Sequence, residues 1–132
     1  MKTFDPIAIR NALLEKNVTL NAPATDDTFE NLKTWLGKPI HPDVISLMRQ
    51  FDGFSDGDFE ERSFVSVWAM EKAIRDNWSK RPLLAFSDWS LNAIIFGFDP
   101  STVGPVISIE DGLVVAPSYA DFWSLLLADR IF

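Results

Sequence analysis

The spacing of the apolar residues changes along this chain, and the change limits the folds open to it. Between residues 5 and 51, apolar residues recur every three or four positions, as in amphipathic helices. From residue 83 to 116, short apolar runs alternate with turn residues, as in strands, and SYADFWSLLL then returns to helical spacing. Helices, antiparallel strands and a closing helix predict an α+β fold, with helices packed on one face of a β-meander sheet.

Two helices are predicted before residue 40, each from its terminal signals. Asp5 caps the first, which begins at Pro6. Asp27 and Glu30 form a capping-box-like start for the second, which closes at Gly37 in a left-handed conformation. The apolar sides are expected to consist of Ile7, Leu13, Leu14 and Val18 in the first helix, and Phe29, Leu32, Trp35 and Leu36 in the second.

A third helix is predicted from His41 and Pro42 towards Phe51, followed by a strand over 63–67 and a short helix over 69–78. The meander strands are predicted at 83–86, 92–98, 106–109 and 113–116. Asp111-Gly112 is a strong hairpin signal between the last two strands, and Ser118 caps the closing helix. Trp35, Trp68 and Trp123 are predicted core residues, so replacing Trp35 or Trp123 by Ala is expected to cost about 3–5 kcal/mol.

The chain of 132 residues has the size of one domain, and no linker or repeat divides residues 1–132. It contains no Cys, which excludes disulfides, zinc–thiolate sites and thiol nucleophiles. The start, MKTFDPIAIRN, lacks the apolar run of a signal peptide, and no stretch approaches the ~20 apolar residues that cross a bilayer. We therefore expect a cytoplasmic protein with no membrane partner.

The net charge of −7 bears on the class of partner. Phosphate groups repel such a chain, so a nucleic acid is not expected as a partner. The same charge would steer a basic protein towards it, although a charge of this size also serves simply to keep a small domain soluble.

Groups able to perform chemistry are scarce. The single histidine, His41, directly precedes Pro42 at a predicted helix start, where a capping or surface role is favoured over a general base or metal ligand. No G-x-S-x-G elbow and no phosphate-binding glycine pattern occurs. We expect no catalytic residue, no metal and no cofactor, and hence no enzyme activity.

Acidic residues gather in two regions. The segment DGFSDGDFEE at 52–61 has five acids and no base, and it fails the calcium-loop spacing because Phe54 stands at the third position. It is either a solvated loop or a binding loop for a basic partner. The span 82–129 has no Lys or Arg, and in its predicted turn SDWSLN the side chain of Trp89 either anchors a partner or folds over the core. The predicted partner-binding residues are Asp52, Phe54, Asp56, Asp58, Phe59, Glu60, Glu61, Asp88, Trp89 and Asp99.

The stretch ENLKTWLGKPIHPDVISLMRQFDGF resembles the opening signature of the SUKH superfamily, which includes the Smi/Knr-type fungal regulators of cell-wall synthesis. Within residues 25–128, SVWAMEKAI, LLAFSDWSLNAIIFGFDPSTVGPVISIEDG and SYADFWSLLL resemble the later family segments in order. SDWSLN, where relatives tend to be glycine-rich, and the Ile-His-Pro step depart from the pattern. The matching positions are Glu30, Leu36, Gly37, Pro39, Pro42, Leu47, Met48, Asp52, Gly53, Phe86, Asp99, Gly104 and Val106.

This resemblance implies a SUKH-like α+β fold without catalytic residues. Bacterial members are similar to immunity proteins, which bind and neutralise toxins from neighbouring cells, and many such toxins are basic nucleases. The expected partner is therefore a basic toxin domain. Two alternatives remain open: a regulatory or scaffold protein of the same fold, and a small-ligand binder with an aromatic-lined pocket. A homodimer, formed through strand edges or through Ile131 and Phe132, also remains open.

Overall fold

The computed structural model of the chain describes residues 4–54, 65–76, 81–90, 93–128 and 130. Within these residues, the elements follow the predicted order of helices, strands and a closing helix. They are α1 (Pro6–Glu15), α2 (Asp26–Leu36), α3 (Pro42–Met48), β1 (Val65–Val67), α5 (Met70–Asp76), β2 (Leu84–Trp89), β3 (Ile94–Phe98), β4 (Val106–Ser108), β5 (Val114–Ala116) and α6 (Tyr119–Leu127).

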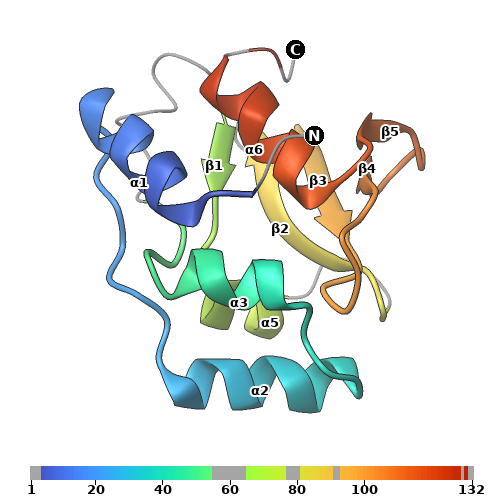
Figure 1. The fold of residues 1–132 in the computed structure, drawn as a ribbon. Helices are drawn as coiled ribbons and strands as arrows, with labels where there is room; N and C mark the ends of the chain where they lie inside the picture. The colour runs from blue at the N-terminus through green and yellow to red at the C-terminus, as the bar shows by residue number, and fades with distance from the viewer. Residues whose placement is uncertain (1–3, 55–64, 77–80, 91–92, 129, 131–132) are drawn as a thin grey trace.

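The strands form one sheet in the order β1-β2-β3-β4-β5, in which every neighbouring pair is antiparallel. The predicted meander and the α+β class are therefore confirmed. In Figure 1, α3 and α6 lie across one face of the sheet with α1 beside them, and α2 lies farthest from the sheet, against α5. Among the described residues, no helix is long and apolar enough to span a bilayer.

An aromatic core joins α6 to the sheet and to the end of α3. Phe98 of β3 stacks on Tyr119 of α6, with ring centroids 4.7 Å apart and an interplanar angle of 15°. Trp123 of α6 meets Phe51 edge to face at 5.6 Å. Both geometries are preferred by aromatic pairs, and together they hold three segments that are far apart in the sequence.

The local capping predictions are confirmed at three helix ends. Asp5 accepts a hydrogen bond from the backbone N–H of Ala8, and Ser118 accepts one from Asp121. Gly37 ends α2 with a φ of 74°. The predicted start of α2 is wrong by two positions, because Thr25 rather than Asp27 is the cap: its side chain accepts from the N–H of Thr28.

The predicted inward side of α1 is half wrong. Ile9 and Leu13 are buried, whereas Ile7 and Leu14 are 51% and 50% exposed. Ile7 and Leu14 are seven residues apart and form one stripe of the helix, while Ile9 and Leu13 form another. In the described part of the chain, α1 packs mainly against α3 and α6, and these neighbours, distant in the sequence, select which stripe is buried.

Strand β2 is longer than predicted, because it runs from Leu84 to Trp89 and includes the residues expected to open the SDWSLN turn. Trp89 pairs with Val65 of β1 on one side and with Ile94 of β3 on the other. A central strand with two partners satisfies its backbone groups on both edges, and this pairing overrides the turn-forming tendency of Ser and Asp.

The third helix, predicted towards Phe51, ends three residues earlier as α3 at Met48, and the strands predicted at 106–109 and 113–116 are each one residue shorter as β4 and β5. The strand expected at 63–67 appears as β1 from Val65, and the helix expected at 69–78 as α5 to Asp76. Residues 63–64 and 77–78 of these two predictions lie outside the described residues. Strand β3 is buried on both faces from Phe96 to Phe98, as predicted, but only partly at Ile94 and Ile95.

Candidate functional site

The predicted acidic binding loop is only partly covered by the structure. Asp56, Asp58, Phe59, Glu60 and Glu61 lie outside the described residues. Phe54, predicted as an exposed anchor, is 3% exposed and belongs to the core. Its backbone N–H donates to the carbonyl oxygen of Val67 in β1 at 3.0 Å, and Phe54 also forms an isolated β-bridge with Leu20. The backbone at Phe54 is therefore bonded to two other segments of the chain.

Asp52 serves a structural purpose between α3 and α5. Its Oδ1 accepts a 2.8 Å hydrogen bond from the backbone N–H of Met70, the first residue of α5. Its carbonyl oxygen accepts from the side-chain amide of Asn21 at 2.9 Å. Burial raises the pKa of the Asp52 carboxyl, the hydrogen bond from Met70 lowers it, and the charge of Glu71 raises it; the net shift is upward.

Replacing Asp52 by Asn is expected to leave the protein at least as stable as the parent at neutral pH. Because the folded-state pKa is raised above 3.8, the folded state binds this proton more tightly than the unfolded chain does. The stability contributed by the group is therefore complete below 3.8 and falls as pH rises through the folded-state pKa. Asn keeps the acceptor for Met70 and has no charge to bury. Urea unfolding at a series of pH values should show that this fall has disappeared.

Asp52→Ala is the matched control, because it removes the acceptor as well as the charge. Relative to Asp52→Asn, it should lose about 1 kcal/mol at every pH, as is typical when a cap is removed. If Asn and Ala variants lost the same stability at neutral pH, the carboxylate charge rather than the acceptor would be what α5 requires.

Asp88 and Trp89 are integrated into the sheet. Asp88 is 4% exposed, and its Oδ1 accepts a 3.1 Å hydrogen bond from the indole N–H of Trp68. The expectation that it lies in an anionic surface turn is therefore wrong. Trp89 is half-buried and packs against the core, as expected if its side chain folds over the core instead of anchoring a partner.

Asp99 organises the turn between β3 and β4. Its Oδ1 accepts from the backbone N–H and the hydroxyl of Ser101, at 3.0 and 2.7 Å. Lys38 lies 3.5 Å from its Oδ2. Burial opposes the charge, but the hydrogen bonds from Ser101 and the charge of Lys38 outweigh it and lower the pKa of Asp99. This carboxylate is thus partly neutralised by its own chain.

His41 is a helix cap, as predicted. Its side-chain Nδ1 accepts a hydrogen bond from the backbone N–H of Asp43 at 3.1 Å. The backbone N–H of His41 donates to the carbonyl oxygen of Pro100 at 2.8 Å. Among the described residues, no three His, Cys, Asp or Glu side chains gather closely enough to hold a metal ion.

The best-formed acidic and apolar surface lies on the β4–β5 hairpin. We call Glu110, Asp111, Leu113 and Val114 the hairpin surface. Leu113 and Val114 are 66% and 62% exposed, the highest values among large apolar residues in the described part of the chain. Both acids are exposed, and Asp111 Oδ1 accepts from the N–H of Leu113 at 3.0 Å, which fixes the turn.

None of the four residues of the hairpin surface is among the predicted partner-binding residues; Asp111 was recognised only as part of the hairpin turn. Leu113 and Val114 read as the start of a half-buried strand, and the burial pattern of β5 shows instead that only Ala116 is buried. A signal was present: Leu113, Val114 and Val115 are consecutive, and successive residues of a strand point to opposite faces. In a strand covered on one face only, at least one of them faces solvent.

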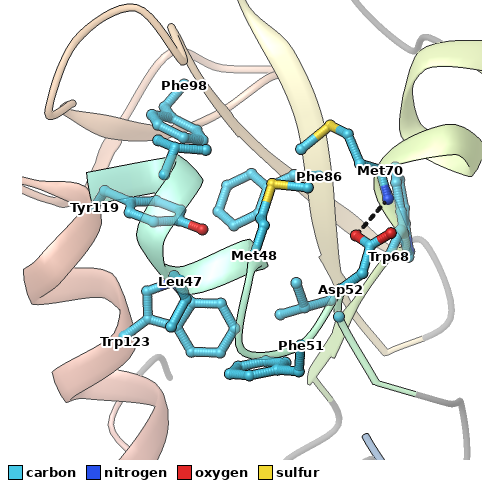
Figure 2. A pocket seen from close by; sticks show the side chains of 13 residues that line it. Leu47, Met48, Phe51, Asp52, Trp68, Met70, Phe86, Phe98, Tyr119 and Trp123 are labelled. Atoms are coloured by element: carbon cyan, nitrogen blue, oxygen red, sulfur yellow. Dashed lines mark hydrogen bonds between the residues drawn. The ribbon is translucent and has the colours of Figure 1, made fainter. Parts of the chain in front are cut away.

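Two surface grooves and one small cavity are further candidates within the described residues. The larger groove, about 690 Å³, lies between α1 and α6, and its acids Asp5 and Asp121 are engaged in helix capping. The other, about 470 Å³, lies between α2 and α3. The cavity, about 20 Å³, is lined by residues of α3, β1, α5, β2, β3 and α6 and has Asp52 in its wall (Figure 2). Ligand pockets usually exceed about 300 Å³, so the cavity is too small for a metabolite.

No protein-family model matches this chain, and no curated protein matches it.

Proposed function

We propose that this chain is a non-catalytic protein-binding module that acts in the cytoplasm as an immunity protein, binding and neutralising a basic toxin domain. The observation that carries the proposal is the hairpin surface, where exposed apolar side chains stand beside carboxylates. The resemblance of residues 25–128 to the SUKH superfamily supplies the biological context.

The hairpin carboxylates differ from the other acids of the fold. Asp26 pairs with Arg49, and Asp76 pairs with Lys72, within the chain. Within the described residues, neither acid of the hairpin surface has a Lys or Arg within ion-pair distance. The span 82–129 contains no basic residue that could compete for them. Their charge is therefore available to a partner.

The apolar part of the hairpin surface would stabilise the complex with such a partner. Burying a Leu or Val side chain that is now in water stabilises a complex by about 1.5–3 kcal/mol. Charges at the rim of an interface mainly raise the rate of encounter, while buried apolar contacts mainly slow dissociation. Acids around an apolar centre match a partner with Lys or Arg around an apolar pocket.

The backbone edge of β5 is poorly suited to strand addition. Strand β5 has three residues, and its register with β4 slips between Val106 and Ile107, so that Val115 is an extra, bulged residue. Pro117 follows directly and lacks an N–H. Short, bulged edges with nearby Pro resist pairing with another strand. Contact through side chains is therefore favoured over extension of the sheet.

Co-expression with the product of the neighbouring gene tests the proposal directly. The expected result is that this chain restores growth to cells that make the neighbouring toxin, and that the two proteins co-purify as one complex. A neighbouring product that is toxic yet neither bound nor neutralised would contradict the immunity function. A gene located far from toxin and secretion genes would favour the regulatory alternative.

Within such a complex, charge and apolar variants of the hairpin surface should affect different rates. Glu110→Gln with Asp111→Asn keeps the turn acceptor, and it should lower the association rate on the order of tenfold at low salt and less at high salt. Leu113→Ser should instead raise the dissociation rate. Surface plasmon resonance at two salt concentrations measures both rates.

Leu14→Ser on α1 is the matched control for Leu113→Ser, because it removes an equally large side chain that is 50% exposed. Figure 1 shows α1 on the opposite side of the molecule from β4 and β5. It should leave both rates unchanged. Equal losses from the two serine variants would show that the hairpin is not the contact surface.

A further inference from the structure

The two faces of the sheet differ in what covers them. Successive residues of a strand point to opposite faces, and directly paired residues of neighbouring strands share a face. Phe96 and Phe98 of β3 contact the rings of Phe122 and Tyr119 in α6, and both are buried. Figure 1 shows α3 and α6 over this face. The residues of β3 that alternate with these two phenylalanines therefore point to the other face of the sheet.

Four branched apolar residues occupy that other face. Gly97 stands between the two phenylalanines of β3; Ile107 of β4 pairs with Gly97, and Val114 of β5 pairs with Ile107. Ile95, two residues before Gly97, shares the same face. The side chain of Ile109 also lies there, because a Cβ added to Gly97 would meet its Cδ1 and Cγ1 atoms. We call Ile95, Ile107, Ile109 and Val114 the outer face.

The outer face is apolar where a solvent-facing sheet is usually polar. Val114 is 62% exposed, and the three isoleucines are partly exposed. Antiparallel sheets that face water on one side commonly alternate apolar inward residues with polar outward residues. In β3, β4 and β5, by contrast, the outward positions hold only apolar residues and Gly97. Contiguous exposed apolar surface marks interaction sites, and Val114 makes this one continuous with the hairpin surface.

Charge indicates which partner would cover the outer face. Glu110 and Asp111 directly follow Ile109 and are exposed, and the span 82–129 contains no Lys or Arg. A second copy of this chain would bring together two molecules of net charge −7, whose repulsion opposes association. A partner with Lys or Arg beside an apolar surface meets complementary charge instead. The outer face therefore suits a basic protein better than a homodimer.

The dimensions of the outer face match those of a helix. Its residues lie on three adjacent strands, which span roughly 10 Å at about 4.8 Å per strand spacing, and an α-helix with its side chains is about 10–12 Å across. An apolar sheet face is stable when another element covers it, and helices commonly do so.

We infer that the outer face binds an amphipathic α-helix of the partner, with the apolar stripe of the helix on the isoleucines and its Lys or Arg residues against Glu110 and Asp111. The inference rests on the proposed function, because it takes the partner to be a basic protein. It adds the element of the partner that is recognised and extends the contact from the hairpin across β4 to β3.

Nuclear magnetic resonance of the full chain, labelled with 13C at the Ile δ1 methyl groups, tests the inference without the toxin. The probe is a synthetic amphipathic helical peptide with a Leu stripe flanked by Lys, and the control peptide has Glu in place of each Lys. The Lys peptide should shift the methyl signals of Ile95, Ile107 and Ile109 but not that of Ile7 on α1. The Glu peptide should bind on the order of tenfold more weakly.

Three results of this titration would overturn the inference. Unshifted signals from the outer face, or shifts centred on Ile7, would show that the helix does not bind there. Equal affinity of the two peptides would show that charge does not select the partner. Outer-face shifts that follow the protein concentration alone would assign this face to a second copy of the chain.

Variants of the outer face separate this inference from the immunity function. Ile107→Thr keeps a β-branched side chain in the strand, and it should raise the dissociation rate of the Lys peptide and of the toxin on the order of tenfold. Ile7→Thr, the same substitution at a position that is 51% exposed, should leave both rates unchanged. Val114→Thr, at the most exposed position of the outer face, replaces Ile107→Thr if that variant does not fold.

A toxin that is bound and neutralised equally well by the parent, Ile107→Thr and Val114→Thr would refute the outer face while the immunity function stood. Binding of the Lys peptide to the outer face in a chain that neutralises no neighbouring toxin would support the helix site and contradict the immunity function.

Discussion

Replacing Gly53 by Ala is expected to destabilise the protein by about 3–5 kcal/mol, enough to lower the thermal midpoint by on the order of 10–25 °C. Gly53 has a φ of 74°, a left-handed conformation that costs other residues roughly 1–2 kcal/mol. A Cβ there would also lie 2.8 Å from the backbone carbon and oxygen of Trp68. Backbone atoms cannot rotate away, so the clash adds the cost of overpacking.

The segment around Gly53 has no freedom to relieve this clash. The carbonyl oxygen of Gly53 accepts a hydrogen bond from the backbone N–H of Asn21 at 3.1 Å. The backbone N–H of the next residue, Phe54, donates to the carbonyl oxygen of Val67 at 3.0 Å. Moving away from Trp68 would break at least one of these bonds. We therefore expect the variant to lose stability even if the backbone adjusts.

Gly37 and Gly112 separate the two causes of this loss. They have φ values of 74° and 73°, within one degree of Gly53, but a Cβ at either would meet no atom within 4 Å. Gly37→Ala and Gly112→Ala should therefore lose only the conformational part, about 1–2 kcal/mol. Thermal or urea unfolding measures all three variants. Equal losses at the three positions would show that the contact with Trp68 has no effect.

Trp123→Ala is the second large effect, with an expected loss of about 3–5 kcal/mol. Trp123 is 1% exposed and lies at the meeting point of α6, the end of α3 and the sheet. It packs edge to face on Phe51 and Phe122, at 5.6 and 6.0 Å. Truncation would leave a cavity bordered by rigid rings that cannot collapse to fill it.

Trp35→Ala should cost less than half as much, although the sequence predicted the same loss for both tryptophans. Trp35 is only half-buried on α2, and one side of its ring is covered by the guanidinium of Arg81 at 5.8 Å. Such an exposed cation–π contact contributes roughly 0.5–1 kcal/mol. Urea unfolding of the two variants tests the ranking, and a reversed order would mean that α2 rather than α6 secures the core.

The elements of this fold were largely predictable because their signals are local. The cap at Ser118, the left-handed end at Gly37 and the turn at Asp111-Gly112 each depend on residues at most four positions apart. The helix and strand periods that gave the α+β class are local in the same sense. Chain positions distant from these segments do not alter them.

The candidate site was less predictable, because exposure is set by distant partners. Phe54 and Asp88 read as surface residues within acidic segments, but Leu20, Val67 and Trp68 cover or bond them. Leu113 and Val114 read as strand residues, and they are exposed because no element lies over that side of β5 in the described structure.

The sequence by itself determined the order and type of the elements, most helix caps, the hairpin turn and the absence of basic residues from 82 to 129. The tertiary structure decided which stripe of α1 is buried, how far β2 extends, and which apolar residues reach solvent. The physical reason is the range of the interactions: capping and turn formation act within one turn of chain, whereas burial and strand pairing depend on contacts between segments that only the folded structure brings together.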